Sequence, residues 1–214
     1  MAPRHAAALA GALLLVGCAP HATPGSGHPA TETRALSPFD AIVLKGVGLL
    51  YVRVGAPAGI EITGDDNLLA LLETKVEQGR LLIAPREPIR ARSKLVYRVT
   101  TPALASLEAR GALQVVVQGL SAGDFALKTS GAVDATLAGK TGALSVHVRG
   151  AGSVRAAALE ASVVDVTLRG SGAVGVHARS RLRADIAGAG SVRYRGAPLV
   201  RAQAFGGGSV TRLD

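Results

Sequence analysis

The sequence predicts an all-β fold, namely a right-handed parallel β-helix, or β-solenoid, of about six glycine-cornered coils, with an N-terminal β-rich cap region that contains one short helix. Three observations predict it. A glycine-centred phrase returns every 18 to 21 residues, apolar and polar residues alternate between the glycines, and aromatic residues make up only 3% of the chain. A repeat of this length is typical of stacked folds, in which like residues of successive coils lie above one another.

The first 17 residues have the parts of an export signal. Arg4 and His5 form a short polar start, residues 6–16 form an apolar run too short to span a bilayer, and Leu15-Val16-Gly17-Cys18 is the processing site. This site resembles a bacterial lipobox, which implies that residues 1–17 are removed as a lipoprotein signal peptide and that Cys18 is lipidated. An ordinary cleaved signal that happens to contain a cysteine is the alternative.

Lipidation of Cys18 would anchor the protein to a membrane. Because residue 19 is Ala rather than the Asp that retains enteric lipoproteins in the inner membrane, we expect the outer membrane of the cell envelope, on either its periplasmic or its surface face. Residues 18–35 are rich in Pro, Gly, Ser, Thr and His and lack apolar periodicity, which predicts a flexible tether. Residues 36–214 suffice for one core and are expected to form a single domain.

The N-terminal part of this domain, residues 36–103, contains strand-like runs separated by turn residues. The sequence Asp65-Asp66-Asn67 precedes an apolar run from Leu68 to Val76, which predicts a short capped helix that ends by Gly79. The predicted strands are Ile42–Lys45, Leu49–Val54, Ile60–Thr63, Arg80–Ile83 and Leu95–Val99.

Residues 104–214 form the predicted repeat solenoid. When the repeats are aligned on one glycine each, even offsets are apolar and odd offsets are largely polar, so each coil contains a strand with one face turned inward. The glycines are expected at corners, where a positive φ or a close approach to the next coil excludes larger residues. A phosphate-binding loop would need a helix after the phrase, and none is predicted. The aligned glycines are Gly111, Gly131, Gly152, Gly172, Gly190 and Gly208.

The chain carries a formal net charge of +9, and a basic surface favours anionic partners. Three residues before their aligned glycines, Lys128, Arg149 and Arg169 are predicted to form an outward row, with about 4.8 Å between coils. Arg155 and Arg193, three residues after their glycines, belong to a second basic group. We interpret these five residues as candidate anion-binding residues; the alternative is that their side chains simply extend into water.

Several short motifs, taken in order, resemble one known family. They are Phe39-Asp40, the runs 60–69 and 77–83, the repeated Gly-Ser-Gly-like corners, and the run 194–198. Their order and spacing resemble the auto-transporter adhesin head GIN domain family over residues 36–214. The resemblance implies an all-β, β-helix-like domain in exported bacterial proteins, often lipoproteins. It supplies no catalytic or binding residues.

The sequence therefore favours an envelope lipoprotein with a non-enzymatic binding or structural domain. Export makes nucleic acid an unsuitable partner, so the expected contacts are the membrane through Cys18, and anionic glycan, lipopolysaccharide or an envelope protein. The alternative is a carbohydrate-active lyase or hydrolase with stacked Asp residues. However, Asp165 and Asp185 lie at different offsets from their aligned glycines. Asp134 is expected beside Arg155, where an ordinary ion pair explains it as well as a catalytic role does. No Ser-His-Asp set or His cluster follows from the repeat, so we expect no catalytic residue, cofactor or metal site.

Overall fold

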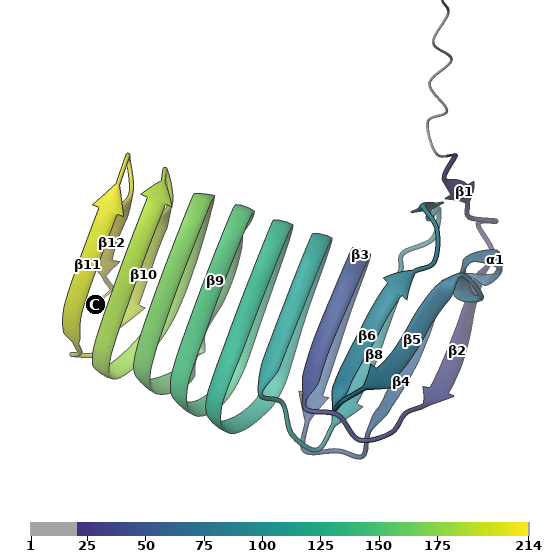
Figure 1. Ribbon diagram of the computed structural model, residues 1–214, viewed down its shortest axis with the longest axis horizontal. Coiled ribbons are helices and arrows are strands. Elements are labelled where there is room, and N and C mark those ends of the chain that lie inside the picture. Colours follow the sequence, from purple (N-terminus) through teal and green to yellow (C-terminus); the bar gives the residue numbers. More distant parts are fainter. Residues whose placement is uncertain (1–20, 214) are drawn as a thin grey trace, which may run out of the picture.

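The computed structural model describes residues 21–213, and most of them lie in β-strands (Figure 1), which confirms the all-β prediction. A single helix accompanies the strands in this range. In chain order the elements are β1 (Thr23–Pro24), β2 (Pro29–Ala35), β3 (Ala41–Val54), β4 (Gly59–Asp65), α1 (Asp66–Leu69), β5 (Leu72–Glu77), β6 (Arg80–Pro85), β7 (Ile89–Arg90), β8 (Val96–Thr101), β9 (Ser106–Gly188), β10 (Ser191–Arg195), β11 (Leu199–Phe205) and β12 (Ser209–Arg212).

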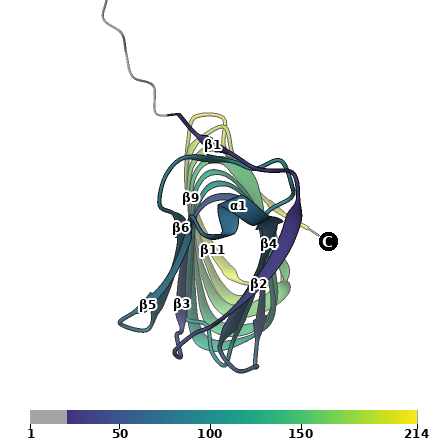
Figure 2. The same ribbon diagram turned by 90° about the vertical axis from the view of Figure 1, so that its right-hand side faces the viewer.

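The second half of the chain winds through successive turns that lie side by side, and we call each turn a coil. Figure 1 shows the 83-residue element β9 passing through several coils. Both β10 and β11 pair in parallel with β9, and β12 pairs in parallel with β10. Strand β3 pairs in parallel with the start of β9 over residues 41–53. The N-terminal part therefore joins the same stack, as Figure 2 shows from its N-terminal end.

The inward side chains form one apolar core that extends from Phe39 to Val192. In the last part of β9, for example, Leu182, Ala184 and Ile186 are at most 1% exposed. The residues between them point outward and reach water. Burying a Leu or Ile side chain stabilises a fold by about 1.5–3 kcal/mol. The alternation of apolar and polar residues therefore decides which face of each strand turns inward.

The N-terminal end of the stack corrects the tether predicted for residues 18–35, within its described part, residues 21–35. All of β2 pairs antiparallel with β4. The guanidinium of Arg34 donates hydrogen bonds to the carbonyl oxygens of Leu69 and Leu72, at 2.8 and 2.6 Å. It also pairs with Glu32 on the same strand. The polar composition suggested a tether, but these polar groups find partners within the cap, and the strand is ordered as a result.

A buried carboxylate holds the same end of the stack together. Asp65 is 0% exposed and accepts hydrogen bonds from the backbone amides of Gly27, Arg92 and Ser93, at 2.9, 2.8 and 3.1 Å. Burial alone would raise its pKa, but a hydrogen bond from the Ser93 side chain and those from the amides lower the pKa of Asp65 to about 2. The carboxylate thus joins the first described segment of the chain to the loop before β8.

The predicted short helix is present but ends earlier than expected. Helix α1 covers only Asp66–Leu69, and β5 occupies the rest of the predicted helical run. The apolar spacing fits a helix, but the β-branched Thr74 and Val76 favour a strand. Strand β5 also forms an antiparallel hairpin with β6. Asp65 flanks the helix without a side-chain capping bond, because its carboxylate accepts the three amides described above.

Two predictions lie outside the described residues. They are the export signal of residues 1–17 and the lipidation of Cys18, and both stay predictions. Within residues 21–213, no helix has the length and apolar character needed to cross a lipid bilayer.

Candidate functional site

A column of glycines marks one corner of the stack. Gly111, Gly131, Gly150 and Gly170 have φ values of 126°, 102°, 113° and 126°. A Cβ added to Gly131 would lie 2.5 Å from the carbonyl oxygen of Gly111, and one added to Gly150 would lie 2.6 Å from that of Gly131. Glycine is therefore required both by the backbone conformation and by the close approach of the coils. The same column includes Gly46, Gly188 and Gly206.

This column corrects the alignment made from the sequence. Gly111 and Gly131 belong to it, but the later coils contribute the first glycine of each Gly-x-Gly phrase, whereas the alignment used the second. Of the second glycines, Gly152 also has a positive φ, of 157°. Gly172, Gly190 and Gly208 have no positive φ but are needed for space: a Cβ added to Gly172 would lie 2.7 Å from the Gly152 carbonyl oxygen. The corners predicted at Gly152, Gly172, Gly190 and Gly208 are replaced by Gly150, Gly170, Gly188 and Gly206.

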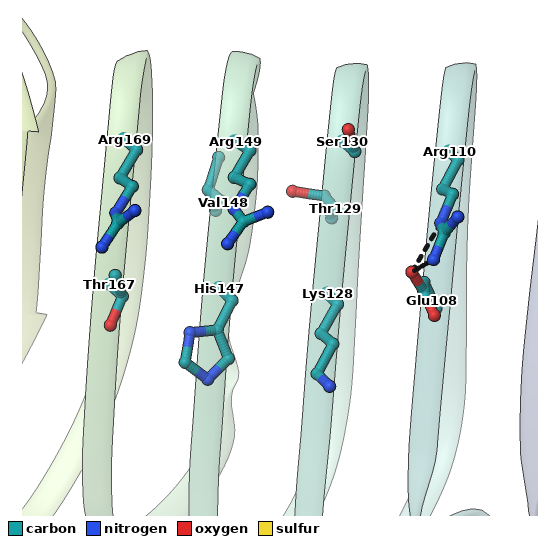
Figure 3. A pocket seen from close by; sticks show the side chains of 10 residues that line it. All are labelled: Glu108, Arg110, Lys128, Thr129, Ser130, His147, Val148, Arg149, Thr167 and Arg169. Atoms are coloured by element: carbon teal, nitrogen blue, oxygen red, sulfur yellow. Dashed lines mark hydrogen bonds and ion pairs between the residues drawn. The ribbon is translucent and has the colours of Figure 1, made fainter.

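The corrected register changes the predicted basic row. The residues directly before the corner glycines are Arg110, Ser130, Arg149 and Arg169, and Figure 3 shows them at one level on neighbouring coils. We call these four residues the arginine column. Lys45 extends it by one coil, because Lys45 of β3 is the strand partner of Arg110.

Lys128 lies beside the arginine column rather than within it. It belongs to a second column, two residues earlier on each coil, that contains Glu108, Lys128, His147 and Thr167 (Figure 3). The two columns line an open hollow of about 730 Å³. Thr129, between Lys128 and Ser130, is buried and only 4% exposed. The structure therefore brings Lys128, Arg149 and Arg169 onto one surface, but in two adjacent columns.

The positive charge of this surface is only partly neutralised. Arg110 pairs with Glu108 on its own strand, with Nε 2.6 Å from Oε1. Among residues 21–213, no carboxylate forms an ion pair with Lys128, Arg149 or Arg169, and all three are exposed. Neighbouring strands lie about 4.8 Å apart, and like charges on adjacent strands repel each other. An anion that bridges neighbouring coils would relieve this repulsion.

Arg155 and Arg193 of the second predicted basic group are not direct strand neighbours. On its two sides, Arg193 has Gly175 and Thr211 as strand partners, so Arg155 is not its neighbour. The ion pair of Asp134 with Arg155, which the sequence offered as an alternative to a catalytic role, is not among the ion pairs of the described residues. The Asp134 Oδ1 atom instead accepts hydrogen bonds from the backbone amide and the Oγ of Ser153, at 2.9 and 2.6 Å. Arg155 and Arg193 are exposed, separate positions.

The carboxylates that a carbohydrate-active enzyme would need are apart. Asp134 follows its corner glycine, whereas Asp165 and Asp185 precede theirs by different distances along the chain. Asp185 pairs with Arg183 at 3.0 Å. In the described part of the chain, no group of three or more His, Cys, Asp or Glu side chains is placed to hold a metal ion. Asp134, Asp165 and Asp185 therefore do not form the facing pair that general acid and base catalysis on a glycan would use.

Sequence reasoning missed Lys45, Arg110 and Ser130 as members of the arginine column, although a signal was present. Each of them directly precedes a corner glycine, as Arg149 and Arg169 do. Alignment on the first glycine of each phrase would have placed all five at one offset. The alignment on the second glycine instead placed Glu108 and Lys128 in the row.

Comparison with known proteins gives a family and a fold. A family model described as "Putative auto-transporter adhesin, head GIN domain" matches residues 38–198. The chain is similar to the crystal structure of a "putative adhesin" from Bacteroides fragilis, with a TM-score of 0.72, 21% identity, and coverage of 89% of this chain and 99% of that chain. It is also similar to a "putative lipid binding protein" from Parabacteroides distasonis, with a TM-score of 0.59, 19% identity, and coverage of 91% and 100%. No protein of curated function matches.

The likeness to these structures, at such low identity, shows the fold alone. The family model is more informative, because it covers most of the chain and its range contains both columns of the basic surface. The resemblance found in the sequence is confirmed: the chain belongs to the auto-transporter adhesin head GIN domain family.

Proposed function

We propose that this protein is an exported, non-enzymatic binding protein of the cell envelope, whose β-solenoid domain presents the arginine column and the adjacent Lys128 to anionic saccharides. The ligand groups would be the carboxylates or phosphates of an acidic glycan or a lipopolysaccharide. One observation carries the proposal: Arg149, Arg169 and Lys128 are exposed, have no ion-pair partner among the described residues, and lie on stacked parallel strands.

The shape of the site favours a long anionic polymer over a small metabolite. Small-molecule sites are usually concave, mostly apolar and enclosed. Here the hollow is open and lined largely by polar and charged side chains that recur from coil to coil. Arginine binds carboxylate and phosphate with two parallel hydrogen bonds. A polymer laid along the stack could meet one such group on each coil.

The location in the envelope rests on separate support. The family description and the similar structures refer to adhesin-like proteins, and the sequence of residues 15–18 fits a lipobox. We therefore propose that Cys18 is lipidated and anchors the domain to the outer membrane. The right-handed winding of the solenoid, predicted from the sequence, belongs to the same proposal.

Retention on immobilised lipopolysaccharide and on immobilised polygalacturonate tests the binding proposal. The first carries phosphates and the second carboxylates, so the two probes separate the possible sources of negative charge. The test variant replaces Lys128, Arg149 and Arg169 with Gln. At low salt we expect its retention on at least one of the two probes to fall by tenfold or more, on the order of 1.4 kcal/mol or more of lost interaction.

A matched control removes the same charge elsewhere. Arg80, Arg86 and Arg90 are exposed residues near the N-terminal end of the stack, and their replacement with Gln should leave retention close to that of the unmodified chain. An equal loss in both variants would mean that only net charge matters. That result, or unchanged retention of the test variant on both probes, would overturn the proposed site.

A further inference from the structure

The two ends of the stack differ in how well their edge strands are protected against pairing with another chain. At the N-terminal end, β2 is the outermost strand of the sheet, and it carries the ion pair of Glu32 with Arg34, whose guanidinium is turned inward onto the carbonyl oxygens of Leu69 and Leu72. Inward-pointing charges are a common protection of an edge strand against pairing with another chain. Helix α1 and the segment held by Asp65 lie against the same end (Figure 2).

The other end of the stack has no such protection within the described chain. Strand β11 pairs with β9 on one side only, and all seven of its residues are exposed. It contains no proline and a single charged residue, Arg201. Leu199 is 79% exposed and Phe205 is 71% exposed. Figure 1 shows β11 at the C-terminal end of the stack, together with β12.

The inner face of β11 continues the core without a cover. Val200, Ala202 and Ala204 are the strand partners of Leu182, Ala184 and Ile186, which are at most 1% exposed one coil earlier. One further strand beside β11 would bury these three residues and pair the free side of its backbone.

The sequence of β11 suits a second copy of itself as that strand. In an antiparallel pair centred on Ala202, Leu199 lies opposite the partner's Phe205 and Val200 lies opposite the partner's Ala204. Arg201 lies opposite the partner's Gln203, so no like charges face each other. The two most exposed large apolar side chains of the strand thus cover each other, and the arrangement has the closed two-fold symmetry of most soluble dimers.

We propose that two copies of this chain associate end to end through antiparallel pairing of their β11 strands. The protected β2 edge argues against a head-to-tail fibre, because β11 would find no free apolar strand at the other end. The interface is small, so we expect monomer and dimer to coexist at roughly micromolar protein concentration. The dimer would place the two arginine columns on one continuous stack of sheets.

Two measurements on the full chain carrying Cys18→Ser test this proposal. In sedimentation equilibrium, we expect a concentration-dependent dimer that the double change Leu199→Lys and Phe205→Lys converts to monomer, since each Lys would face a Lys of the partner. Circular dichroism would verify that this variant keeps its strand content. A dimer that persists in the folded variant, or a protein that stays monomeric at high micromolar concentration, would overturn the proposal.

The second measurement does not depend on the folding of the charged variant. Residues directly opposite each other in an antiparallel pair have Cα atoms about 4.5–5.5 Å apart, within the range that a disulfide can bridge. Ala202→Cys in the Cys18→Ser background should therefore give a covalent dimer on mild oxidation. Ala132→Cys, an exposed mid-stack position, is the control and should stay monomeric. Equal cross-linking of the two variants, or none at position 202, would contradict the β11 pairing.

Discussion

Replacement of Gly150 with alanine tests whether the corner glycines hold the coils in register. Gly150 has a φ of 113°, and its new Cβ would lie 2.6 Å from the Gly131 carbonyl oxygen. Holding an L-residue in such a backbone conformation costs about 1–3 kcal/mol. The forced separation of the two coils adds an overpacking cost of about 1–3 kcal/mol. We therefore expect the free energy of unfolding to fall by about 2–6 kcal/mol, although residue 150 lies at the surface.

The assay is urea unfolding of the full chain, followed by far-UV circular dichroism. Gly175→Ala is the matched control, because the nearest atom to its new Cβ would be the Val154 carbonyl oxygen at 3.9 Å, an ordinary contact. A Gly to Ala change without strain alters stability by about 1 kcal/mol or less. If Gly150→Ala unfolds at the same urea concentration as Gly175→Ala, the corner arrangement is refuted.

Three further predictions concern the core, the N-terminal end and the anchor. Thr129 Oγ1 is buried without a hydrogen-bond partner among the described residues, so Thr129→Val should raise the free energy of unfolding by about 1–2 kcal/mol in urea; a lower stability would show that the hydroxyl has a partner. The pKa of Asp65 is lowered from 3.8 to about 2, so its contribution to stability is complete above 3.8 and is lost as the pH falls through about 2. Melting temperatures measured across this window should show Asp65→Asn less stable than the unmodified chain at neutral pH, with the difference shrinking in acid; a constant difference would contradict the assigned role. Cys18→Ala should abolish incorporation of labelled palmitate, and incorporation that persists would exclude Cys18 as the anchor.

Much of the fold follows from the sequence, because each strand has one face buried in the core and one face exposed to solvent. The alternation correctly placed β3, β4, β6 and β8 and the inward residues of the coils. The helix prediction was wrong over residues 72–76. The spacing of the apolar residues fits a helix there, but this segment pairs with β6 in a hairpin. The tether prediction was wrong because the carbonyl oxygens that bind Arg34 lie 35 and 38 residues away along the chain, where local composition does not show them.

The candidate site was predicted only in part, because it depends on the register between coils. A shift of two residues in the register between coils decides whether Ser130 or Lys128 lies beside Arg149. Both residues point outward, so the pattern of inward apolar residues is the same in either register. Alternation therefore cannot detect the difference. The close approach of Gly150 to the Gly131 carbonyl oxygen, whereas Gly152 approaches Val133, identifies which glycine of the phrase continues the corner column. The ion pair of Arg110 with Glu108 likewise could not be predicted, because it depends on where the two side chains lie.

The salt dependence of lipopolysaccharide binding tests the central claim most directly. If the arginine column binds anionic groups, the affinity of the unmodified chain should fall steeply as sodium chloride rises from roughly 50 to 300 mM, a range over which exposed charges become strongly screened. The variant with Gln at positions 128, 149 and 169 should bind more weakly and with a shallower dependence on salt. Binding by the unmodified chain that is independent of salt, or an equal dependence in both proteins, would contradict the account.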